Sequence, residues 1–343
     1  MARMDILCGE AGNQIPVPIF RMLGSDPVRQ YDNGLGTNRQ GVITLEPVYK
    51  EGGGDPAWVN WYFQQFVEGA SMEYAYTQAG QENSFTWDAM SKGFEIQLPL
   101  IARLRDEKKV RVETLETSGK WFKAHYKITP ATAVTVNEDL KGGDRKTVWF
   151  NSRFYRVNLL WENGNLRFRD IHLFNEKFSS VYETDKATAN ECSFFTLPFV
   201  DGYIWSKPST IAGLRLKAII NGQEVSIEGG SPSISDAVKG NLHITWPIKT
   251  FEGSLTMDID ERQVKMKLAT KEPVMWFWDL TAADDAKLPF KAINPDRIDC
   301  QFEGMDYTIS AKAGRFSKPD GAVVLRMTPV DNALILDLAG GQL

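Results

Sequence analysis

A chain of 343 residues that is 43% hydrophobic and 24% charged has the composition of a folded protein, and it is long enough for two domains. The formal net charge of −5 is mild and no basic stripe is present, which excludes a nucleic-acid-binding surface built on clustered Lys and Arg. A neutral or weakly charged ligand fits this composition better.

Three strand-and-helix pairs follow one another in the first 128 residues. β-branched and alternating runs predict the strands, and Asp55, Thr86 and Ser118 are suited to cap the helices. Pro99 is expected to kink or split the second helix. The predicted strands are 41–49, 71–79 and 110–115, and the predicted helices are 57–69, 87–109 and 118–126.

Successive strand-and-helix pairs imply a parallel sheet with crossover helices. A closed (β/α) barrel needs about eight such pairs. We therefore predict that residues 1–128 form the C-terminal part of a (β/α)-barrel-like domain whose first strands are absent. A small open sheet of three or four strands is the alternative.

From residue 129 onward the pattern is almost entirely that of strands. About fourteen alternating or β-branched runs are separated by Gly, Asn, Asp and Pro at short spacing. The ENGN sequence at 162–165 lies between two such runs and predicts a hairpin. We expect residues 129–343 to form a large antiparallel β-sandwich, or two smaller ones, so the predicted fold class is α/β plus all-β.

In a (β/α) barrel the reactive side chains lie where the strands end. Glu46 follows the first predicted strand, and Glu82 follows the second. Two carboxylates on neighbouring strand ends are the minimum for hydrolysing a glycosidic bond, one as acid and the other as base or nucleophile. Glu46 and Glu82 are the predicted catalytic pair, with a solvated surface charge as the alternative for each.

Side chains suited to sugar hydroxyl groups and sugar rings are close to this pair in the sequence. The loop around Glu82 offers amides and an aromatic ring. Asp26 lies before a proline in a segment rich in turn formers, where a turn is the simpler interpretation. The predicted substrate-binding residues are Arg21, Asp26, Tyr76, Gln81, Asn83 and Trp87.

No pattern for a metal or an organic cofactor is present. Cys8, Cys192 and Cys300 are far apart, and the three histidines show no ligand spacing. His172 lies in a predicted strand, where a buried structural histidine is the expected role. Dinucleotide, P-loop and nucleophile-elbow motifs are lacking, so we expect no cofactor.

Aromatic residues are abundant, with 10 Trp, 10 Tyr and 19 Phe. Aromatic faces stack on the apolar faces of sugar rings, which favours a carbohydrate ligand. The same residues fill the cores of β-sheets, and composition by itself favours that second interpretation.

No apolar run reaches the roughly 18 residues of a membrane helix, so we expect no membrane insertion. The first residues lack the apolar core of a secretory signal. We expect a cytoplasmic protein, or a periplasmic or secreted one if the N-terminus is truncated. The sequence leaves the oligomeric state open.

Five segments resemble an uncharacterised bacterial family that is similar to glycoside hydrolases and polysaccharide deacetylases. That resemblance implies an incomplete (β/α)₇-type barrel followed by a C-terminal β domain. The metal-binding Asp and His of polysaccharide deacetylases lie on the earliest strands, so no metal site transfers to this chain. The segments are IPVPIFRMLGSDPVRQYD, ITLEPVY, AGQENSFTW, RVETLETSGKWFK and RVNLLWENGNLRFRDIHLF.

These patterns lead to the hypothesis of a carbohydrate-active, glycoside hydrolase-like protein that acts on an oligo- or polysaccharide. The alternative is a non-catalytic carbohydrate-binding or accessory protein, with Trp205, Trp276 or Trp278 as an exposed platform for the ligand. A further alternative is an incomplete fragment without its own activity.

Overall fold

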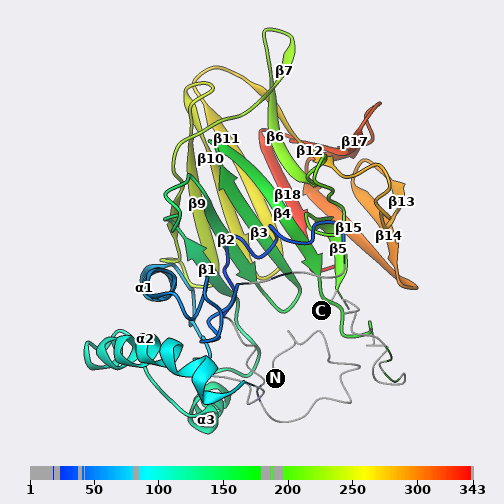
Figure 1. The fold of residues 1–343 in the computed structure, drawn as a ribbon. Coiled ribbons are helices and arrows are strands. Elements are labelled where there is room, and N and C mark those ends of the chain that lie inside the picture. Colours follow the sequence, from blue (N-terminus) through cyan, green and yellow to red (C-terminus); the bar gives the residue numbers. More distant parts are fainter. Residues whose placement is uncertain are drawn as a thin grey trace.

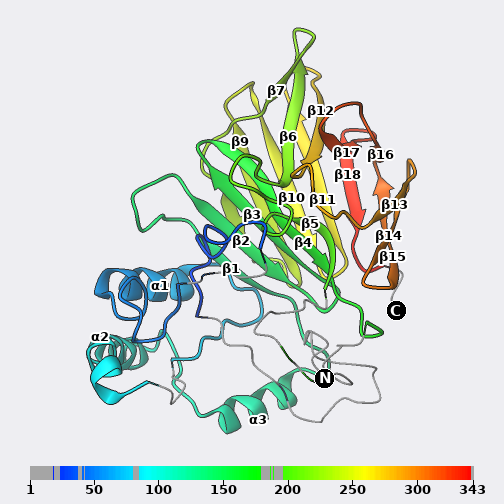
Figure 2. The same cartoon turned by 45° about the vertical axis from the view of Figure 1, so that its right-hand side comes forward.

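The structure is a computed structural model, and it describes residues 18, 24–37, 41, 43–79, 85–178, 186, 188 and 196–340. Two large antiparallel sheets lie face to face as a β-sandwich. Three helices lie together at one end of the sandwich, below strand β1 (Thr132–Val136), as Figures 1 and 2 show.

The first sheet has ten strands. Their bounds are Thr132–Val136 (β1), Lys146–Asn151 (β2), Tyr155–Glu162 (β3), Asn165–Leu173 (β4), Leu197–Asp201 (β5), Gly213–Ile220 (β6), Gln223–Ser226 (β7), Met275–Thr281 (β12), Arg315–Ser317 (β16) and Val323–Thr328 (β17). The order is β1-β2-β3-β4-β6-β12-β17-β16, with β5 paired to β4 and β7 paired to β6.

The second sheet has eight strands. Their bounds are Ser233–Ser235 (β8), Asn241–Ile248 (β9), Gly253–Asp260 (β10), Gln263–Thr270 (β11), Phe290–Ile293 (β13), Arg297–Phe302 (β14), Met305–Ala313 (β15) and Ala333–Asp337 (β18). The order is β13-β14-β15-β18-β11-β10-β9-β8.

Alternating apolar residues form the core between the sheets. Nearly every second residue of β9 and β10 is buried, because side chains of a strand point alternately to the two faces of its sheet. Trp246, Trp276 and Trp278 are at most 1% exposed, and they lie in one continuous apolar cluster. Burial of each large apolar side chain stabilises the fold by about 1.5–3 kcal/mol.

The three predicted helices are present, with shifted bounds. α1 (Pro56–Glu68) is capped by the Asp55 side chain, as expected. α2 (Trp87–Asp106) continues through Pro99 as one helix. α3 (Leu115–His125) begins earlier than predicted because Thr114 caps it in place of Ser118. None of the described helices has the length and apolar character needed to cross a membrane.

The predicted barrel segment is wrong, because the three strands that it requires are not formed in the described residues. Segments 41–49 and 71–79 contribute only isolated bridges, and 110–115 has no strand partner. Leu45 packs into a small apolar cluster with α1, and Val112 is 57% exposed. A β-branched run becomes a strand only when a neighbouring strand pairs with its backbone.

The β-sandwich predicted after residue 129 is present, and so is its hairpin at 162–165. Asn163 and Gly164 have φ values of 52° and 72°, the left-handed conformations that a two-residue hairpin turn requires. The helices end at His125 and the strands begin at Thr132, while the division into domains at residue 128 stays a prediction.

We expect Gly164→Val to destabilise the protein by about 1–2 kcal/mol, because a side chain on Cβ strains a left-handed residue. Gly119→Ala is the matched control. Gly119 lies inside α3 with open space around its Cα, so alanine should stabilise by about 0.4–1 kcal/mol. Urea unfolding measures both, and equal shifts of the same sign would contradict the turn assignment.

Candidate functional site

The outer face of the ten-stranded sheet carries the charged residues of the candidate site. Residues that point away from the sandwich core on neighbouring strands form cross-strand rows. Strands β2, β3, β4, β6, β12 and β17 lie side by side (Figure 1) and share one such row. Its members are Thr147, Leu160, Arg167, Arg215, Asp279 and Arg326.

Arg167 and Arg215 are directly opposed in this row, and both are half-buried. Arg167 donates from Nη1 to the carbonyl oxygen of Ala212 at 2.8 Å. Arg215 donates to Thr281 Oγ1 and to the carbonyl oxygen of Ile211, each at 2.7 Å. In the part of the chain that the structure describes, neither guanidinium forms an ion pair with a carboxylate.

Two opposed cations with no carboxylate in ion-pair contact are unfavourable for the fold. Burial, followed by the nearby Arg215 and Arg169 guanidiniums, lowers the pKa of Arg167 to about 9, and burial also lowers the pKa of Arg215. Like charges that face each other across strands destabilise a sheet. A bound carboxylate would remove this cost, because the guanidinium fork matches its two oxygens. The pair therefore has the chemistry of an anion-binding site.

A third arginine and two carboxylates border the pair. Arg145 donates from Nε to Glu162 Oε1 at 2.5 Å and from Nη1 to Asp32 Oδ2 at 2.7 Å. Glu162 lies at the end of β3, diagonal to Arg167 on β4, and attracts both Arg167 and Arg215. The Glu162 and Asp32 side chains are 35% and 37% exposed, so a ligand can reach them.

Residues 24–37, which we call the strap, cross the same face of the sheet in front of β2 to β4 (Figure 1). Arg169 on β4 donates to the carbonyl oxygens of Pro27 at 3.1 Å and Val28 at 2.7 Å. Trp149 on β2 donates from Nε1 to the Pro27 carbonyl oxygen at 2.8 Å. Two strands thus hold the strap through its backbone.

A β-bulge provides the anchor for the strap. Asn158 pairs with Asp170, and the next residue, Leu159, pairs with Phe168, so Arg169 has no opposite residue on β3. Arg169 and Asp170 are adjacent in sequence, yet both contact the strap on the outer face.

Asp170 is the centre of a buried polar cluster beside the anion site. It accepts two hydrogen bonds from Arg156, at 3.0 and 2.9 Å, and one from the hydroxyl of Tyr31 in the strap. Burial alone would raise the pKa of Asp170, but Arg156 and His172 hold it below its ordinary value. The cluster therefore keeps a charged carboxylate beneath the strap.

His172 extends this cluster toward β5. Its Nδ1 lies 2.8 Å from Thr196 Oγ1, and its Nε2 lies 3.4 Å from Asp201 Oδ2 and 3.7 Å from an oxygen of Asp170. The imidazole is buried among side chains of the protein, in agreement with the structural role expected for it.

Four of the predicted site residues lie outside the described part of the chain. They are Arg21, Gln81, Glu82 and Asn83. The catalytic pairing of Glu46 with Glu82 therefore stays a prediction. Glu46 itself is half-buried in the loop between the strap and α1.

Asp26 is 1% exposed, and its carboxylate bonds within the protein. Oδ1 accepts the backbone amides of Val28 and Arg29 at 2.9 Å each, and Oδ2 accepts Trp58 Nε1 at 3.1 Å. Asp26 thus has the turn-forming role that was the simpler interpretation. These bonds hold the start of the strap against α1.

The two predicted aromatic sugar contacts are not part of the arginine site. Trp87, the first residue of α2, is 67% exposed and stacks on Phe94 with 6.1 Å between ring centroids. Tyr76 is half-buried, and burial raises its pKa. Their role in sugar binding stays a prediction.

The tryptophan platform proposed for the β region is wrong. Trp205, Trp276 and Trp278 are 3%, 1% and 0% exposed, and all three belong to the main core. The aromatic excess of the β region serves packing at these positions.

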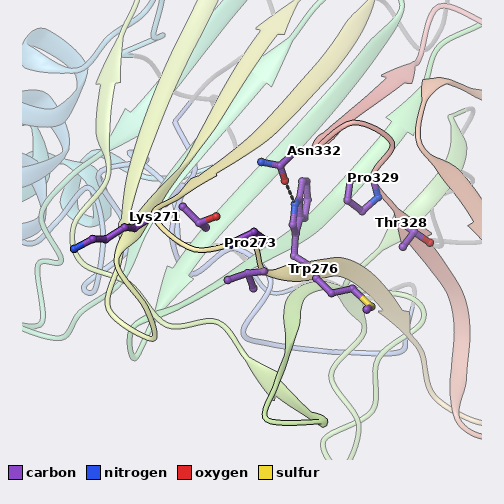
Figure 3. Close-up of a pocket in the computed structure, with 9 residues that line it drawn as sticks. Lys271, Pro273, Trp276, Thr328, Pro329 and Asn332 are labelled. Atoms are coloured by element: carbon purple, nitrogen blue, oxygen red, sulfur yellow. Dashed lines mark hydrogen bonds between the residues drawn. The ribbon is translucent and has the colours of Figure 1, made fainter.

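A cavity of about 480 Å³ lies where β11 and β17 end and β12 begins. Figure 3 shows Asn332 accepting a hydrogen bond from Trp276 Nε1, at 2.5 Å, while Lys271 points away from this pair. The Asn332 amide also donates to the Leu268 carbonyl oxygen, so its polar atoms serve the fold. The lining offers no carboxylate or imidazole, and we assign no chemistry to this cavity.

No group of three or more His, Cys, Asp or Glu side chains within the described ranges is arranged to hold a metal ion. The residues of the anion site are mainly cations, which do not ligate metals.

The chain matches no family model, no curated protein and no solved structure. Together with the two antiparallel sheets, this finding overturns the resemblance to glycoside hydrolases and polysaccharide deacetylases. The local motifs that suggested it are compatible with a different fold, because short loops and hairpins recur in unrelated proteins.

The arginine pair was missed at the sequence level. Arg167 and Arg215 lie in the alternating runs NLRFRDIHL and GLRLKAII, whose pattern assigns both to an outer face. Their opposition depends on β4 pairing with β6, which periodicity within one strand does not reveal.

We expect Asp170→Asn to destabilise the protein by about 3–5 kcal/mol, because it removes the fully buried carboxylate that pairs with the half-buried Arg156. The folded state lowers the pKa of Asp170, so its stabilising contribution is present above the unfolded pKa of about 3.9 and is lost as the pH falls further. Urea unfolding between pH 7 and pH 3 should therefore show a weaker acid dependence in the variant.

Asp258→Asn is the control, since Asp258 bonds His243 on an exposed face and should cost about 1 kcal/mol or less. Equal losses in the two variants would refute a special role of the buried cluster.

Proposed function

We propose that this protein binds an acidic carbohydrate through Arg167 and Arg215 on the outer face of the ten-stranded sheet. The observation that supports the proposal is the direct opposition of two half-buried guanidiniums that lack a carboxylate partner among the described residues. Each retains N–H groups that the backbone carbonyls do not occupy.

A carbohydrate fits better than a simple inorganic anion because of what surrounds the pair. Glu162 and Asp32 are partly exposed acceptors beside the cations. Sugar hydroxyl groups can donate to such carboxylates while an acid group of the same ring meets Arg167 and Arg215. A uronic acid combines both kinds of group on one ring.

Binding, not hydrolysis, is the activity that this face supports. Both carboxylates beside the pair accept hydrogen bonds from the same guanidinium, that of Arg145, and so form a polar margin suited to binding a ligand. Glu46 and Glu82 play no part in this proposal.

Isothermal titration calorimetry with trigalacturonate tests the proposal. We expect Arg167→Gln and Arg215→Gln each to weaken binding by about ten- to a hundredfold, because a hydrogen bond to a charged group contributes about 1.5–3 kcal/mol. The fully methyl-esterified trisaccharide should bind no more tightly than the variants do, since it retains the hydroxyl groups but lacks the charge.

Lys267→Gln is the charge-matched control. Lys267 is an exposed residue of β11 in the other sheet, so its loss removes one positive charge far from the pair. Equal weakening by Lys267→Gln, or equal binding of the ester and the acid, would reject a specific site. Circular dichroism melting of each variant confirms that the compared proteins are folded.

A further inference from the structure

Asp279, opposite Arg215 on β12, is paired with Arg326 and Lys217, and the other charges that border the anion site do not cancel. Arg145, Arg167 and Arg215 provide three positive charges, and Asp32 and Glu162 provide two negative ones. One net positive charge therefore remains among these five residues. Proteins discriminate between ligands by unfavourable contacts to the wrong ligand as well as by favourable contacts to the right one.

Glu162 is the acid best placed to act on a ligand at the pair. On β3 it lies two residues after Leu160, which is directly opposite Arg167, so Glu162 and Arg167 are diagonal neighbours on one face. Long side chains at such positions reach one another. Arg215 is the next residue in the row beyond Arg167.

The carboxylate of Glu162 is held in this position. Its Oε1 accepts Arg145 Nε at 2.5 Å, and Arg145 is in turn bonded to Asp32 of the strap. The strap is itself fixed to the sheet by Arg169. Glu162 cannot turn away from an incoming anion without giving up its bond to Arg145.

We infer that Glu162 is a specificity-determining residue that restricts the site to a ligand group with a single negative charge, such as a carboxylate, and disfavours a dianionic phosphate ester. This inference rests on the proposed function. A single charge on the ligand balances the remaining positive charge of the site. A second charge would face the Glu162 carboxylate, and like charges in close contact oppose binding.

Titration of the protein with three sugar acids at pH 8, followed by NMR chemical shifts, tests the inference. The probes are glucuronate and glucose 6-sulfate, which carry one charge, and glucose 6-phosphate, which carries two. We expect the wild type to bind glucuronate at least tenfold more tightly than the phosphate. In Glu162→Gln that preference should fall to about threefold or less, because the variant site has two net positive charges.

Glu261→Gln is the matched control. Glu261 accepts Arg153 Nε at 2.6 Å in the same kind of Glu–Arg pair, but it lies between β10 and β11 in the other sheet. Its substitution should leave the ratio of the two affinities unchanged.

A measurement on the wild type alone supplements the variants. The second pKa of a phosphate ester is about 6, so at pH 5 glucose 6-phosphate carries close to one charge. We expect its affinity relative to glucuronate to rise several-fold between pH 8 and pH 5.

Three outcomes distinguish the role of Glu162 from the existence of the binding site. If glucuronate binds but Glu162→Gln leaves the ratio unchanged, the role of Glu162 is overturned and the binding site stands. If the sulfate ester alone binds, the site is selective for one charge but its ligand is a sulfated sugar. If none of the probes binds the wild type, both the proposed function and the inference are refuted.

Discussion

The burial of two apolar sheet faces against each other determines which side chains this protein can present. Once every second residue of a strand enters the core, its neighbours must lie on an outer face. The core takes Trp246, Trp276 and Trp278, and no large aromatic side chain is exposed among the described residues from 129 onward. The outer face of the ten-stranded sheet carries the arginines and acids of the site, next to uncharged residues such as Thr147 and Leu160. The side chains available for binding on this face are therefore the ones that the packing of the core leaves outside.

Three arginines of this face show how differently one residue type is used. Arg156 has a carboxylate partner in Asp170, and Arg169 is buried with neutral partners, the carbonyl oxygens of the strap. Arg167 has one carbonyl bond and faces another cation. The first two are explained by the fold that they stabilise. The third has no carboxylate ion pair among the described residues, which is the reason for proposing that it binds a ligand.

Local features of this fold could be predicted from the sequence, and long-range ones could not. The cap of α1 and the 162–165 hairpin depend on a few adjacent residues, and both are present. The barrel prediction was wrong because strand-like runs at 41–49 and 110–115 have no neighbouring strand to pair with. The anion site was missed for the same reason, since it arises where β4 meets β6, 48 positions apart at Arg167 and Arg215. Alternation tells which face a side chain occupies, but only the pairing of strands tells what lies opposite.

The bulge at Arg169 makes the attachment of the strap depend on one extra residue of β4. The residues on either side of it, Phe168 and Asp170, pair with consecutive residues of β3, so the ladder would be continuous without the extra one. One extra residue, Arg169, therefore distinguishes a plain antiparallel ladder from one that anchors the strap. Deletion of Arg169 would restore the continuous ladder and remove the two hydrogen bonds that this residue donates to the strap backbone, and the strap is the segment that brings Asp32 to Arg145.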